Sequence, residues 1–203
     1  QKFLLKGKIL AMKAMDIRNK ERWIHYGDDP DDWFKDEFVD SAIVYLNEVA
    51  QENDHYASDA HFMLGVIYKE KGWFQMSETE FKAALSKDSS NTNVRLGLAA
   101  LYVSQEKFND AEIHLQNAYS KDTANPLISK NMAFLYKYYL YKPESSLVWF
   151  NRFLKSAPRN DLDVNLAKNE CKEIADRYPE YVPSGPQYWL DPQPKFKARK
   201  IGE

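Results

Sequence analysis

Residues 28–32 read Asp-Asp-Pro-Asp-Asp, and carboxylate side chains in such a run are ligands that Ca²⁺ and Mg²⁺ accept. The spacing does not match an EF-hand loop, and no glycine lies in the middle of the run. A helix start explains the same residues better. Asp29 would cap the helix, Pro30 would take its first position, and Asp31 and Asp32 would face the positive end of its dipole. We therefore predict no metal site here.

The side chains that zinc binding or nucleophilic catalysis requires are scattered along the chain. The four histidines, His25, His55, His61 and His114, form no pair on one helical face. The single cysteine, Cys171, lies on an apolar helical stripe, where a buried and unreactive thiol is expected. The sequence contains no glycine-rich phosphate loop and no G-x-S-x-G motif. It predicts a protein with no catalytic residue, no cofactor and no metal, and hence not an enzyme.

Composition narrows the classes of partner. A net charge of −2 over 203 residues gives no global positive field for nucleic acid, and no apolar run approaches the ~18 residues of a membrane span. We expect neither nucleic-acid binding nor direct membrane insertion. The numbering begins at Gln1 rather than at Met, which indicates a fragment or a processed form. The compartment stays open between the cytoplasm and a periplasmic or exported location with an N-terminal signal or anchor before Gln1.

The main signal in the sequence is an internal repeat of 34 residues. Tyr68, Tyr102 and Tyr136 keep this interval, and four further columns share the register. These columns are Leu64, Leu98 and Met132; Gly65, Ala99 and Ala133; Phe74 and Phe108; Ala84 and Ala118. Within a unit the apolar residues recur at helical spacing, and the small residue marks a close crossing of two helices. Each unit therefore predicts a helix, a short turn and a second helix.

Local signals agree with these helix limits. Gly72 suits the left-handed position after a first helix. Asn91 and Asn125 stand where capping residues are needed, and Pro126 follows at a first helical position. The third unit is one residue longer than the others, and we expect the extra residue in its turn, within 137–143.

The units resemble the tetratricopeptide repeat, whose pattern is W-x2-L-G-x2-Y, then A-x3-F, then P. Unit 58–91 matches with His61-x2-Leu64-Gly65-x2-Tyr68 and Ser77-x3-Phe81. Unit 92–125 matches with Arg95-x2-Leu98-Ala99-x2-Tyr102 and Ala111-x3-Leu115. Unit 126–160 matches with Ser129-x2-Met132-Ala133-x2-Tyr136, Ser146-x3-Phe150 and Pro158. The tryptophan column is absent, and spacing carries the match. The resemblance implies an all-α fold, a right-handed α-solenoid of helical hairpins.

The flanks extend this organisation. Residues 1–57 resemble a degenerate first repeat, with Gly7 in its first helix, Ala42-x3-Leu46 in its second, and an insertion at 16–34. Residues 161–178 predict one amphipathic capping helix, which a solenoid needs to cover its last apolar face. Residues 179–203 form a tail rich in proline and aromatic residues that we expect to be extended.

In tetratricopeptide arrays the first helices line a concave groove, and the resemblance places groove residues at fixed positions of each unit. Here they are Phe62, Val66, Lys69, Leu96, Ala100, Val103, Leu127, Lys130, Phe134, Lys137 and Tyr138. We call these the groove residues. Because most are apolar, they predict an interface rather than a clamp for a carboxylate terminus, although periodicity alone does not separate groove from core.

The sequence thus predicts a soluble, non-enzymatic scaffold or adaptor that binds a segment of a protein partner in an apolar groove. Two alternatives stay open: a structural subunit that self-assembles through its repeats into a homo-oligomer, and the regulatory domain of an enzyme whose catalytic part lies outside this chain. A further expectation concerns the tail. Its Tyr181, Tyr188 and Trp189 are predicted to dock on the array, either along the groove or on the end helix.

Overall fold

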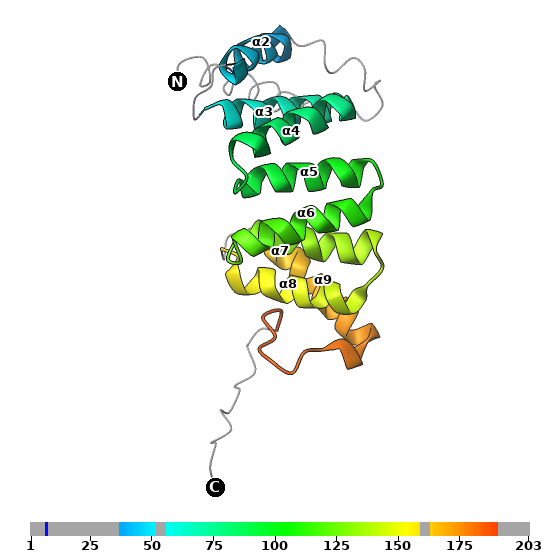
Figure 1. Ribbon diagram of the computed structural model, residues 1–203. Helices are drawn as coiled ribbons and strands as arrows, with labels where there is room; N and C mark the ends of the chain where they lie inside the picture. The colour runs from blue at the N-terminus through cyan, green and yellow to red at the C-terminus, as the bar shows by residue number, and fades with distance from the viewer. Residues whose placement is uncertain (1–6, 8–36, 52–55, 159–162, 191–203) are drawn as a thin grey trace. The chain divides into compact units, whose positions relative to one another are not determined.

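The computed structural model describes residues 7, 37–51, 56–158 and 163–190, and every regular element among them is a helix (Figure 1). The chain divides into two compact units, Gln1–Lys107 and Phe108–Glu203. The helices of the first unit are α2 (Glu37–Gln51), α3 (Ala57–Glu70), α4 (Phe74–Lys87) and α5 (Thr92–Ser104). Those of the second are α6 (Phe108–Lys121), α7 (Pro126–Phe134), the π-helix η2 (Leu135–Tyr139), α8 (Pro143–Ser156), α9 (Asp163–Arg177) and the 3₁₀-helix η3 (Pro179–Tyr181).

In the first unit, two glycines hold one phenylalanine ring between successive repeats. A Cβ atom at Gly65 of α3 would lie 2.6 Å from Cδ1 of Phe81, and one at Gly97 of α5 would lie 2.8 Å from Cε1 of the same ring. A methyl group at either position would force the Phe81 ring to shift, so glycine is favoured at both crossings. The hydroxyl of Ser77 in α4 donates a 2.7 Å hydrogen bond to the carbonyl of Gly65, which fixes the hairpin.

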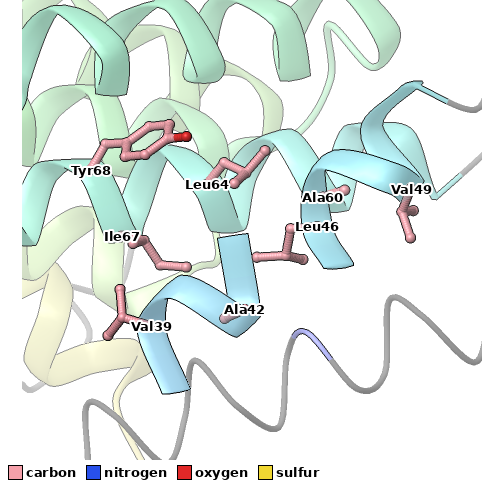
Figure 2. Close-up of a cluster of buried hydrophobic side chains, with 8 residues drawn as sticks. All are labelled: Val39, Ala42, Leu46, Val49, Ala60, Leu64, Ile67 and Tyr68. Carbon is pink, nitrogen blue, oxygen red and sulfur yellow. The ribbon is translucent and has the colours of Figure 1, made fainter. Parts of the chain in front are cut away.

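Helix α2 packs on α3 through a buried cluster to which each helix gives four residues (Figure 2). The members are Val39, Ala42, Leu46 and Val49 from α2 and Ala60, Leu64, Ile67 and Tyr68 from α3. Gly7 also lies against α2, since a Cβ there would be 2.9 Å from Cγ of Leu46. This pairing has the same form as that of Gly65 with Phe81. The insertion at 16–34 and the acidic run at 28–32 lie outside the described residues, so a complete N-terminal hairpin stays a prediction.

The turns between first and second helices share one geometry. Each has a residue in the left-handed region: Gly72 (φ 74°), Glu106 (φ 59°) and Tyr141 (φ 53°). The next residue then donates its N–H to the carbonyl of the repeated tyrosine over 2.8 Å, from Trp73 to Tyr68, Lys107 to Tyr102 and Lys142 to Tyr136. The third turn needs one residue more, and the π-helix η2 accommodates it. The left-handed residue follows the repeated tyrosine by five positions in this turn and by four in the other two, so the extra residue lies after Tyr136, within the expected 137–143.

The capping prediction at Asn91 and Asn125 is confirmed. The Asn91 side chain accepts hydrogen bonds from the N–H groups of Asn93 and Val94, and that of Asn125 accepts one from Leu127. Each amide oxygen satisfies donors that an α-helix leaves unpaired at its first turn.

The core of the second unit lies between α7, α8 and α9. Its buried members are Ala133, Leu147, Phe150, Phe153, Ala167, Cys171, Ile174 and Trp189. Ser146 donates to the carbonyl of Ala133 over 3.0 Å, which repeats the Ser77–Gly65 bond of the first unit. Helix α9 thereby closes the apolar face that α7 and α8 leave open, together with tail residues up to Leu190.

Candidate partner-binding surface

In the first unit, the predicted groove residues of α3 are partly accessible. Phe62, Val66 and Lys69 are half-buried. The Phe62 ring leans on Phe81 with a centroid distance of 5.9 Å, so one face of Phe62 belongs to the core. The Lys69 ammonium lies 2.6 Å from a carboxylate oxygen of Glu70, which neutralises it locally. The α3 part of the surface is therefore apolar with one internally paired charge.

The groove residues of α5 differ in exposure. Leu96 is 8% exposed and is a core residue. Val103 is half-buried and Ala100 is exposed. Helix α5 packs on both α3 and α4, and a helix with two packed faces buries positions that periodicity alone would assign to a surface. In this unit Phe62, Val66, Ala100 and Val103 are the apolar groove residues that stay accessible.

In the second unit, the aromatic groove residues form a stack. The ring centroids of Phe134 and Tyr138 lie 5.9 Å apart, and the two rings are nearly parallel. The ring centroids of Phe134 and Phe150 lie 5.3 Å apart, with the rings edge to face. Tyr138 stays 44% exposed and Leu127 43% exposed.

The basic groove residues of the second unit are engaged by α9. Lys130 lies 2.5 Å from Asp163, and Lys137 pairs with both Glu170 and Glu173. The hydroxyl of Tyr138 donates to Glu170 over 2.6 Å. The hydrogen bond from the Lys137 ammonium lowers the pKa of the Glu173 carboxyl. Acidic side chains of α9 are therefore paired with the basic groove residues of this unit, while Leu127 and Tyr138 stay exposed.

The remaining candidate chemistry is weak. Burial raises the pKa of the Cys171 thiol to about 12, so it is not a nucleophile at neutral pH. His61 is half-buried and lies 2.7 Å from Glu80 in an isolated pair. Among the residues that the structure describes, no cluster of histidine, cysteine and carboxylate side chains is arranged to hold a metal ion. A pocket of about 160 Å³ beside Lys137, Tyr141 and Arg177 is smaller than sites for small organic ligands.

The structure places the three tail residues differently. Trp189 is 6% exposed and lies in the core of the second unit. Tyr181 stacks on Tyr178 at 5.4 Å. Tyr188 is held through its backbone, whose N–H donates to the Asn151 side chain over 2.8 Å. Sequence reasoning missed Asn151, since nothing in the local pattern distinguishes it from other polar residues on α8.

No family model matches the sequence, and no curated protein matches it. Two solved structures share its fold. A structure from the functional characterisation of Pseudomonas aeruginosa PilF has a TM-score of 0.63 and 18% identity, over 89% of this chain and 72% of that one. A structure of MamA (AMB-1) has a TM-score of 0.54 and 14% identity, over 87% of this chain and 85% of that one. Both neighbours are tetratricopeptide-repeat proteins.

The fold is therefore that of an α-solenoid built from tetratricopeptide-type helical hairpins, as the resemblance implied. None of the helices in the described ranges is both long and apolar enough to cross a bilayer.

Proposed function

We propose that this protein is a non-enzymatic scaffold that binds a segment of a partner protein through the accessible apolar residues of α3 and α5. The observation that carries the proposal is that Ala100 is exposed and Phe62, Val66 and Val103 are only half-buried at groove positions of the first unit, whereas Lys130 and Lys137 of the second unit are paired with α9. Apolar side chains left at such positions mark an interface more often than a catalytic site.

The chemistry of this surface defines the partner. Fully burying a large apolar side chain contributes about 1.5–3 kcal/mol, and micromolar binding requires about 8 kcal/mol after the cost of association, so several such anchors have to be buried together. The Lys69–Glu70 pair adds charges of both signs to this surface. Such charges determine the orientation of a bound partner more than they raise its affinity. The fitting partner is a protein segment that presents apolar side chains flanked by polar ones.

Affinity capture with a matched pair of variants tests the proposal. Ala100→Glu with Val103→Glu places charge on the proposed surface, while Val44→Glu places one at a 57% exposed site on α2. Proteins captured by the wild type and by Val44→Glu, but lost with the double variant, support the proposal. Equal capture by all three folded proteins contradicts it. Light scattering of the same samples distinguishes an adaptor from a self-assembling subunit.

A further inference from the structure

Asn151, in the middle of α8, holds the backbone of the tail with both ends of its side-chain amide. Its Nδ2 donates to the carbonyl of Pro186 over 2.8 Å, and its Oδ1 accepts from the N–H of Tyr188 over 2.8 Å. These two backbone groups flank Gln187. A single amide that pairs with a carbonyl and with the N–H two residues later recognises the main chain of the segment, which turns over 187–190, independently of its side chains.

Trp189 supplies the specific anchor beside this backbone contact. It is 6% exposed and belongs to the buried cluster between α8 and α9, whereas the next residue, Leu190, is 37% exposed. A large aromatic side chain in a desolvated pocket, next to satisfied backbone hydrogen bonds, is the arrangement of an interface hot spot.

The stretch that leads into this anchor leaves open space beside Gly185. A Cβ added at Gly185 would meet no atom within 4 Å. Two hydrogen bonds lie within the segment: Gln187 Nε2 donates to Pro183 over 3.4 Å, and the N–H of Leu190 donates to Gln187 over 3.1 Å. Pro183 and Pro186 limit the conformations of the free segment, so little entropy is lost when it docks.

We propose that α8 and α9 form a binding site for a peptide of the class Pro-x-aromatic-Trp that ends in a turn, and that the chain fills this site with its own residues 186–190. A partner protein carrying such a segment would replace the tail. This site belongs to the second unit, whereas the surface of α3 and α5 belongs to the first. Because the tail is attached to the site, its local concentration is in the millimolar range, and it competes strongly with a free peptide.

The test uses the full chain and a fluorescein-labelled peptide with the sequence of residues 183–190. In the chain, Trp189→Ala removes the internal anchor. We expect this variant to bind the peptide at least tenfold more tightly than the wild type, as measured by fluorescence anisotropy. A peptide with alanine in place of its tryptophan should not bind. Adding Asn151→Ala to the Trp189→Ala chain should weaken binding of the original peptide at least fivefold.

A second variant protects the test against loss of folding. Tyr188→Pro removes the N–H that Asn151 accepts but keeps Trp189, and it should also increase peptide binding. Absence of saturable binding to a variant that melts cooperatively overturns the proposal. So does unfolding of both variants, because the segment would then be a structural part of the unit. A wild-type dimer that Asn151→Ala abolishes would assign the site to a second copy, and would overturn the assignment to a partner.

Discussion

The hydroxyl group of Tyr136 donates a 2.6 Å hydrogen bond to Oε1 of Glu112, from the first helix of one repeat to the second helix of the repeat before it. The first unit contains the same relationship at the same interval, where Tyr102 donates to Glu78 over 3.0 Å. Burial, followed by the bond to Glu112, raises the pKa of Tyr136 to about 12. The repeated tyrosine therefore joins neighbouring repeats through a polar bond as well as through packing.

Replacing Tyr136 with phenylalanine should lower the free energy of unfolding by about 1–2 kcal/mol, because the bond to a carboxylate is lost in a buried setting. Urea denaturation followed by circular dichroism measures this. Tyr141→Phe is the control, since Tyr141 is 80% exposed. Equal stability of the Tyr136→Phe protein and this control would show that the hydroxyl bond contributes nothing.

Glu106→Gly should stabilise the protein by about 0.5–1 kcal/mol. Glu106 has φ 59°, a region that glycine enters without steric cost and that other residues enter only with strain. Glu106→Ala is the matched control, because it removes the same side chain and keeps the strain. Thermal melts should rank the glycine variant above the alanine variant. The reverse order would mean that the side chain, rather than the backbone, decides stability at this turn.

Gly65→Ala should cost about 1–3 kcal/mol, because the new methyl group would lie 2.6 Å from the Phe81 ring. Phe81→Leu in the same chain removes the ring that the new methyl group would meet. The double variant should therefore lose less free energy of unfolding than the sum of the two single changes. Chemical denaturation of the four proteins forms the cycle. Strict additivity would indicate that the two residues do not press on each other.

Glu170→Ala should cost about 1–2 kcal/mol, because it removes the buried acceptor of the Tyr138 hydroxyl and one of the two carboxylates that pair with Lys137. Glu173→Ala, on the same helix and also in contact with Lys137, should leave stability close to that of the wild type, since the Glu173 side chain is 55% exposed. Equal losses from the two substitutions would contradict the assignment of the buried charge to Glu170.

Alkaline pH should destabilise the protein partly through Cys171. The thiol ordinarily titrates near pH 9.0, and burial raises its folded-state pKa to about 12. Between these values the folded state retains a proton that the unfolded state has lost, so the free energy of unfolding falls as pH rises. Cys171→Ala should make this decline shallower from about pH 9 to about pH 12. Parallel curves for the two proteins would mean that the thiol does not contribute.

The sequence alone determined the helical hairpins. The 34-residue interval, the small residue at the helix crossing and the capping asparagines act within a few residues, and local periodicity describes such features well. For this reason the all-α fold and the caps at Asn91 and Asn125 followed directly from the residues.

Only the tertiary structure decided which groove residues are free. Leu96 is buried because α5 packs on two helices, and Lys130 and Lys137 are covered because the acidic side chains of α9 lie opposite them. The position of the tail was also not determined by local pattern, since Tyr188 and Asn151 are distant in sequence and come together only when the tail packs on the core of α8 and α9. Periodicity identifies a helical face but not its neighbour, because burial depends on contacts between residues far apart in the chain.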